Sequence, residues 1–179
     1  MNYYIADTHF GHKNIFKYEP DRPGNSIEEM QEIMIEKWNN KVKENDNVFI
    51  LGDFAFRGAK MKMEDIVELL KKLNGNKWLI IGNHDKDYIT KLCKYGMIGI
   101  ADELEIYDGD DYVVMSHYPF EIWNHKHHGA IHLHGHTHKS ELEHEDYTVK
   151  NRYNVGCMWF NYEPVTLKEI KEYWKEVKQ

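Results

Sequence analysis

Residues 79–85, Leu-Ile-Ile-Gly-Asn-His-Asp, are an apolar run that stops at a glycine and is followed by an amide, an imidazole and a carboxylate. A short β-branched run ending in glycine predicts the end of a buried strand. In α/β proteins, ligands bind outside the carboxyl ends of the strands. The three polar groups after Gly82 therefore predict a binding or catalytic site at the end of a strand.

The same pattern recurs along the chain, because four other predicted strands end in Asp or His. Each polar group alone is weak evidence, since a turn aspartate or a surface histidine explains it equally well. Five such strand ends in one small domain indicate a shared site. Its candidate residues are Asp7 and His9 after strand 1–6, Asp53 after 47–51, Asn83 and His84 after 77–81, His117 after 112–116, and His136 and His138 after 131–134.

The segments between these strands predict an α/β sandwich. Ser26 and Glu29 form a capping box at the start of a helix that continues to Val42. Other helices are predicted at 63–73, 87–95 and 166–178, and further strands at 104–107 and 152–155. Residues 16–24 contain two prolines and predict a surface excursion. We expect one domain over residues 1–179, with two sheets facing each other and helices on their outer faces.

Composition excludes several classes of protein. No apolar run approaches the roughly 20 residues of a membrane helix. The first residues lack the features of a signal peptide, and two cysteines are too few for a disulfide framework, so we expect a cytoplasmic protein. The formal net charge of −7 disfavours long nucleic acid as a partner. The 12 histidines point to metal or proton chemistry. The sequence leaves the oligomeric state open.

The number of donor groups indicates two metal ions. Asp7, His9, Asp53, Asn83, His117, His136 and His138 provide seven ligands, more than one four-coordinate zinc site can use. Two divalent ions roughly 3.5–4 Å apart, sharing a carboxylate and a water, can use them all. Nitrogen and oxygen ligands without thiolate suit manganese, our first choice, and also iron, zinc, nickel or cobalt.

These residues resemble the ordered motifs of the calcineurin-like metallophosphoesterases, and the resemblance covers residues 7–138. It implies a four-layer α/β/β/α sandwich of two mixed sheets flanked by helices. It also implies that one ion is held by Asp7, His9, Asp53 and His138, and the other by Asp53, Asn83, His117 and His136. His84 corresponds to the general acid, which protonates the leaving group while the metals activate water.

The chain departs from the protein-phosphatase motif of this family at Phe56, where those members carry a second acid that orients the catalytic histidine. The partner of His84 is thus open between Asp85 and a backbone carbonyl. Arg57 and His12 are candidate substrate contacts. For the aromatic residues of segment 118–128 we favour plain packing, and for His132 and His134 a supporting or core role.

We expect a phosphoesterase that hydrolyses a small phosphate ester, a phosphodiester rather than a monoester. A metal-dependent nuclease is one alternative, which the acidic charge opposes. A non-catalytic scaffold of the same fold is another, which the intact set of ligands and His84 opposes.

Overall fold

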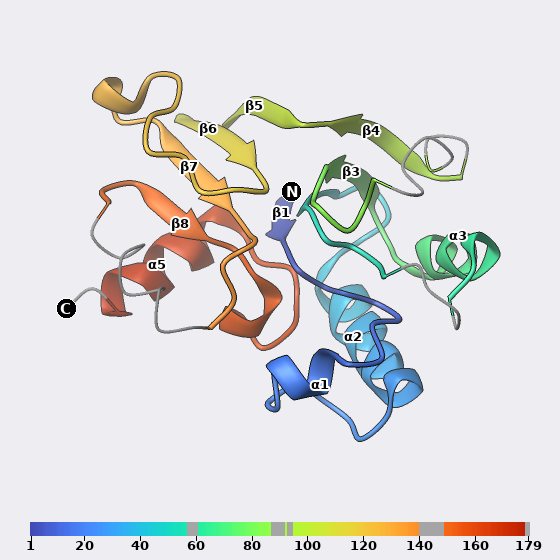
Figure 1. Cartoon of the computed structure of the whole chain (residues 1–179). Helices are drawn as coiled ribbons and strands as arrows, with labels where there is room; N and C mark the ends of the chain where they lie inside the picture. The colour runs from blue at the N-terminus through green and yellow to red at the C-terminus, as the bar shows by residue number, and fades with distance from the viewer. Residues whose placement is uncertain (57–60, 87–91, 93–94, 140–148, 178–179) are drawn as a thin grey trace.

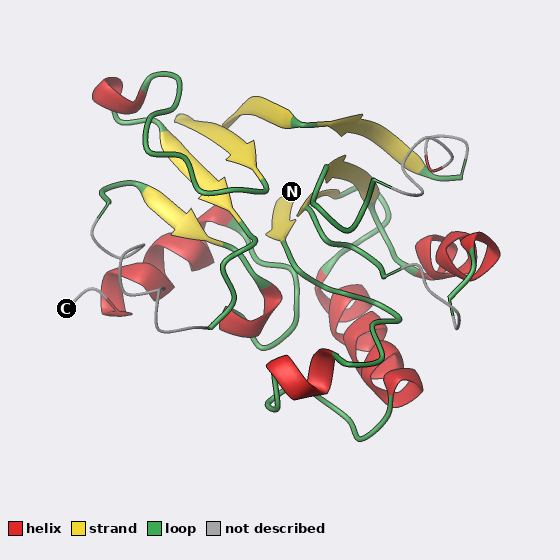
Figure 2. Ribbon diagram, viewed as in Figure 1, coloured by secondary structure: helices red, strands yellow, loops and turns green. Residues whose placement is uncertain are grey.

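The computed structural model describes residues 1–56, 61–86, 92, 95–139 and 149–177, and consists of two four-stranded sheets with helices around them (Figures 1 and 2). The first sheet is parallel, in the order β1 (Asn2–Ile5), β2 (Asn47–Leu51), β3 (Asn76–Ile80) and β4 (Met97–Ala101). The second has the order β5 (Glu103–Asp108), β6 (Asp111–Ser116), β7 (Ile131–His134) and β8 (Arg152–Asn154); β5 and β6 are antiparallel and the other pairs parallel.

The described helices are α1 (Ile15–Tyr18), α2 (Ile27–Lys41), α3 (Met63–Lys72) and α5 (Leu167–Val177), with short 3-10 turns η1 (Lys126–His128) and η3 (Cys157–Trp159). The predicted cap of α2 is present, because the Ser26 hydroxyl accepts a hydrogen bond from the Glu29 N–H at 3.1 Å. No helix in the described part of the chain has the length and apolar character needed to cross a membrane.

Successive side chains along the strands of the first sheet point to opposite faces, so each face carries an apolar layer. On β2, Val48 and Ile50 belong to the core that includes Trp38 of α2 and Leu70 of α3. Phe49 and Leu51 point the other way and belong to the core between the sheets. The inner residues of β6 and β7 complete this second core, and so do Leu167, Ile170 and Trp174 of α5.

Backbone hydrogen bonds join the two sheets along β1. The Ala6 N–H donates to the Val155 carbonyl at 2.9 Å, and the Cys157 N–H donates to the Ala6 carbonyl at 2.9 Å. Tyr4 and Val165 form an isolated antiparallel bridge on the same strand. These bonds bring the carboxyl end of β1 beside that of β8, so the strand ends of both sheets open onto one edge.

The α/β fold class with two sheets and flanking helices is confirmed, with differences in detail. Two mixed sheets were expected, but only the second is mixed, since every described strand pair of the first is parallel. The outer face of β6 and β7 is covered by the segment that contains Trp123 and Ala130, which pack on Val114. Strand β4 was not expected, and the helix expected at 87–95 lies mostly outside the described residues. The prediction that 16–24 is a surface excursion is wrong at Glu19 and Arg22, both of which are buried.

Candidate metal centre

Sharp turns follow the strands that carry the predicted ligands. Asp7, His9, Asp53 and His136 have left-handed backbone angles, with φ of 57°, 47°, 52° and 68°. Side chains other than glycine rarely adopt this conformation, and it persists where the surrounding structure enforces it. The ends of β1, β2 and β7 therefore hold bent backbone at the edge where the sheets meet.

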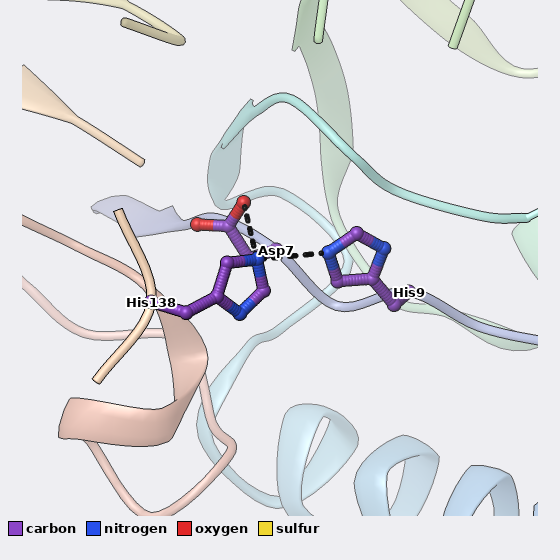
Figure 3. A group of neighbouring side chains, drawn as sticks. All are labelled: Asp7, His9 and His138. Carbon is purple, nitrogen blue, oxygen red and sulfur yellow. Dashed lines mark hydrogen bonds and ion pairs between the residues drawn. The ribbon is translucent and has the colours of Figure 1, made fainter. Parts of the chain in front are cut away.

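Asp7, His9 and His138 form one group of donor atoms (Figure 3). The Nε2 atoms of His9 and His138 lie 3.2 Å apart. The Nε2 atom of His138 lies 3.9 Å from Oδ1 of Asp7. Asp7 and His9 are buried and His138 is partly exposed, so this group opens to solvent on the His138 side.

A second group contains Asp7, Asp53 and His117, all of them buried. The Nε2 atom of His117 lies 3.6 Å from Oδ2 of Asp53 and 3.0 Å from Oδ1 of Asn83. The same Oδ2 atom of Asp53 lies 3.7 Å from Nε2 of His9. Asp53 thus stands between the two groups.

The chemistry of these donors fits a cation. The Nδ1 atom of His117 lies 2.8 Å from the Leu51 carbonyl, which can only accept, so Nδ1–H donates there and Nε2 is the atom turned toward the other groups. This Nε2 atom faces the oxygens of Asn83 and Asp53 at 3.0 and 3.6 Å. Imidazole nitrogen together with carboxylate and amide oxygen is a set of ligands that suits divalent ions such as manganese, iron and zinc.

The buried charges lead to the same conclusion. Burial raises the pKa of Asp7 to about 7, although the neighbouring histidines oppose the shift. Burial, reinforced by the charge of Arg22, lowers the pKa of His9 well below its ordinary value. The carboxylate form of Asp7 is therefore costly unless positive charge lies beside it.

His136 lies at the edge of the second group. Its ring is 5.0 Å from that of His117 and 4.5 Å from that of Tyr118, measured between centroids. Its backbone N–H donates to both carboxylate oxygens of Asp7, at 3.0 and 3.2 Å. All seven predicted ligands are thus brought to one edge of the sandwich.

His84 stands beside these groups with 40 % of its side chain exposed. Its backbone N–H donates to Oδ1 of Asp53 at 2.9 Å, and its Nε2 atom lies 3.9 Å from Oδ2. Its ring lies 5.5 Å from both His9 and Phe56. His84 and His12 also line a cleft of about 450 Å³.

Asp85 ties the ends of β2 and β3 together. Its carboxylate is fully buried and accepts backbone hydrogen bonds from Gly82 and Asp53 at 2.8 Å and from Phe54 at 3.0 Å. Gly82 has no room for a side chain, because a Cβ there would lie 2.3 Å from Oδ1 of Asp53. Asp85, a candidate partner of His84 in the sequence, is instead a structural carboxylate that places Asp53.

Asp85→Asn should lower the free energy of unfolding by about 2–3 kcal/mol, because charge-assisted bonds to buried backbone are lost and an amide donor faces N–H groups. Urea unfolding measures the change. The exposed Asp110→Asn is the matched control and should stay within about 0.5 kcal/mol of the wild type. Equal stability of the two variants would contradict the structural role of Asp85.

Glu19 and Arg22 support the first donor group, and the sequence analysis missed both. The Glu19 carboxylate bonds to Nδ1 of His138 and accepts a hydrogen bond from Nε of Arg22 at 2.8 Å. The Arg22 guanidinium also donates to the carbonyls of Asp7 and Thr8, each at 2.7 Å. This pair, which we call the Glu19–Arg22 clamp, fixes both the loop after β1 and the ring of His138.

The clamp also sets the electrostatics of His138. Burial lowers the pKa of His138, but the hydrogen bond that its Nδ1–H donates to Glu19 and the charges of Asp7 and Glu19 outweigh it, so the pKa is raised. Burial raises the pKa of Glu19, yet His138 and Arg22 reverse the shift and lower it. A carboxylate behind a metal-binding histidine fixes its orientation and increases its basicity.

Glu19→Gln should weaken binding of divalent metal about 10- to 100-fold, because the carboxylate behind His138 is lost. Calorimetric titration of metal-free protein with Mn²⁺ measures the change without any substrate. Glu176→Gln, at an exposed position of α5, serves as the control and should bind as the wild type does. An unchanged affinity in Glu19→Gln would remove Glu19 from the site.

The remaining predicted residues divide by position. Arg57 lies outside the described residues. His132 is buried and its ring stacks on Phe120 at 5.0 Å between centroids, which confirms a core role. Trp123 packs with Val114 and Ala130, as expected for an aromatic residue of that segment.

A comparison with protein families identifies the class to which this site belongs. The model of the calcineurin-like phosphoesterases matches residues 3–140, so the chain belongs to that family. The matched range contains every candidate ligand. The strand ends that gather these ligands are therefore the part of the chain that the family shares.

Individual relatives extend the similarity to nearly the full chain. An uncharacterized protein of Methanocaldococcus jannaschii is 36% identical over 170 residues, which cover 94% of this chain and 88% of that protein. The gene 66 protein of Mycobacterium phage D29 is 26% identical, with 99% and 97% covered. The crystal structure of a protein of unknown function from Aquifex aeolicus aligns with a TM-score of 0.75 at 26% identity and covers 96% of this chain and 98% of that one.

Proposed function

We propose that this protein is a metal-dependent phosphoesterase that uses two divalent ions and His84 as general acid to hydrolyse a small phosphodiester. One observation carries the proposal. Carboxylate, amide and imidazole groups from five strand ends converge, with pairwise distances between their N and O atoms of 3.0 to 3.9 Å, and the exposed imidazole of His84 stands at their border. The family to which the chain belongs supports the same reaction class.

The residues would divide between the ions as follows: Asp7, His9, Asp53 and His138 hold one, and Asp53, Asn83, His117 and His136 hold the other. The short distances from Oδ2 of Asp53 to the Nε2 atoms of His9 and His117, 3.7 and 3.6 Å, support a bridging role for that carboxylate. When bound, the ions would polarise the phosphate and make a water more acidic. Manganese remains our first choice.

The protein's own groups then orient the substrate and move a proton. A general acid must lie within hydrogen-bond reach of the leaving oxygen, and such transfer contributes about 10²–10⁴-fold. His84 is suited to this task because its ring faces the cleft while its backbone N–H is fixed on Asp53. The Glu19–Arg22 clamp holds the opposite wall of the site through His138.

The cleft favours a substrate with little negative charge. Among the described residues that line it, Lys139 is the only one with a permanent positive charge. A phosphodiester carries one charge at neutral pH where a monoester carries close to two, so it needs fewer cationic partners. The cleft volume of about 450 Å³ suits a small molecule.

Purified protein, stripped of metal and then loaded with Mn²⁺, should hydrolyse bis-p-nitrophenyl phosphate in preference to p-nitrophenyl phosphate, and chelation should abolish turnover. Parallel assays with single-stranded DNA and RNA test for a nuclease. A higher kcat/KM for these polymers than for any small ester would contradict the proposal and identify a nuclease. Absence of turnover with every divalent metal tested would leave a non-catalytic member of the family.

His84→Asn should reduce kcat at least 100-fold, because the leaving oxygen loses its proton donor. Metal content, measured by inductively coupled plasma spectrometry, should match that of the wild type, since His84 is not proposed as a ligand. His127→Asn, at an exposed position of η1, is the matched control. Loss of both metals in His84→Asn would assign this histidine a structural role instead.

Asp53→Asn should weaken or empty both metal positions, because one carboxylate serves both groups. The metal-to-protein ratio after dialysis should fall well below that of the wild type, and Asp110→Asn should leave it unchanged. The Asp53 variant is isosteric and keeps an oxygen for the His84 N–H. Two tightly held ions in this variant would refute the bridging assignment.

A further inference from the structure

Tyr18, His12 and His84 line the cleft, and the ring of Phe56 packs beside those of His12 and His84. The ring centroids of Tyr18 and His12 lie 6.3 Å apart, those of His12 and Phe56 4.3 Å, and those of Phe56 and His84 5.5 Å. We call these four residues the aromatic wall. Phe56 is the position where the phosphatase-like motif would carry an acid, so an apolar ring here has replaced a charge.

The outer end of the wall is open to solvent. Tyr18 is 72 % exposed, although it is a large apolar residue beside a functional cleft. Its ring therefore remains accessible to a molecule that enters the cleft. Ile15, from the same helix α1, also lines the cleft.

The wall is fixed to the candidate metal centre. Ile15 is buried at the start of α1, and Glu19 follows the helix directly. Glu19 is held by Arg22 and bonds to His138, so the turn that carries Tyr18 cannot shift without moving a candidate ligand. A rigid aromatic platform binds a flat group with little loss of conformational entropy.

We propose that the aromatic wall binds a planar heteroaromatic group on the alcohol that leaves, so that the substrates are phosphodiesters of nucleosides. The argument rests on the proposed function of His84. A general acid must touch the leaving oxygen, which places the rest of the leaving group along the rings next to His84. Bases stack on aromatic side chains whatever their sequence, because every base has a π-face.

The lining residues favour a base over a bare sugar or an alkyl chain. Rings predominate among the described residues that line the cleft, and none of these residues is an Asp, Glu, Asn or Gln. The rings of Tyr18, His12 and His84 offer stacking and edge contacts that a linear alkyl chain would not use. A nucleoside could belong to a small nucleotide ester or to the end of a single strand, and the net charge of −7 favours the small ester.

The test compares two diesters with the same kind of leaving alcohol. Methyl uridine 5′-phosphate and methyl ribose 5-phosphate both release a primary 5′-hydroxyl and methyl phosphate, and they differ only in the base. With Mn²⁺-loaded protein, kcat/KM for methyl phosphate release should be about 10-fold or more higher for the uridine ester. A short oligonucleotide assayed in parallel distinguishes a strand end from a small ester as the source of the nucleoside.

Tyr18→Ala should reduce the ratio of kcat/KM for the uridine ester to kcat/KM for the ribose ester about 10-fold. Tyr18→Phe should retain the preference, because the ring remains. Tyr107→Ala removes an equally exposed tyrosine, at 71 %, from β5 and should change neither value.

Equal kcat/KM for the two esters in the wild type, or an unchanged preference in Tyr18→Ala, would overturn the inference while the proposed hydrolysis stands. Absence of turnover for every ester would reject the proposed function instead. In that case calorimetric titration with the two intact esters still decides the inference. Tighter binding of the uridine ester that depends on Tyr18 supports it, and equal affinities reject it.

Discussion

Crowding of carboxylate, amide and imidazole groups at one buried edge is the constraint on which the rest of this molecule depends. The Nε2 atom of His117 lies 3.0 Å from the Asn83 oxygen and 3.6 Å from Oδ2 of Asp53, inside a region where burial raises the pKa of Asp7 and lowers that of His9. Ionisable groups are costly to bury unless an opposite charge lies beside them. The surrounding structure holds these groups in place: left-handed turns end the strands, Asp85 bonds to two strand ends, and Gly82 leaves space for Asp53.

The sequence predicted the candidate ligands and the fold class because both depend on local signals. An apolar run that ends in glycine and a polar residue marks the end of a strand wherever it occurs, and parallel strands bring such ends to one edge. Local spacing alone therefore predicted four of the candidate ligands, Asp7 and His9 in one pair and His136 and His138 in the other, without any knowledge of long-range contacts. The two amphipathic helices α2 and α3 were predicted equally well, because their apolar residues recur with the period of a helix.

The parts that escaped prediction depend on distant partners. Glu19 reaches His138 across 119 positions of sequence, and nothing near Glu19 distinguishes it from a charged residue on a proline-rich surface loop. Asp85 holds two strand ends together because three backbone N–H groups converge on its carboxylate. The sequence alone does not show this convergence. The series of rings from Tyr18 to His84 likewise joins three separate segments of the chain. Local pattern identified the candidate ligands and the candidate acid, and tertiary contacts decide which groups hold them.

The backbone bonds of Ala6 with Val155 and Cys157 have a consequence for the order of folding. They join the first strand of the chain to residues from its last quarter, so the edge that carries the candidate ligands closes only after most of the protein is assembled. Contacts of such long sequence separation form slowly, because the entropy of closing a large loop must be overcome first. A growing or truncated chain would carry Asp7 and His9 without His117, His136 or His138 beside them. The proposed metal-binding geometry therefore requires segments from both halves of the chain to be in place at the same time.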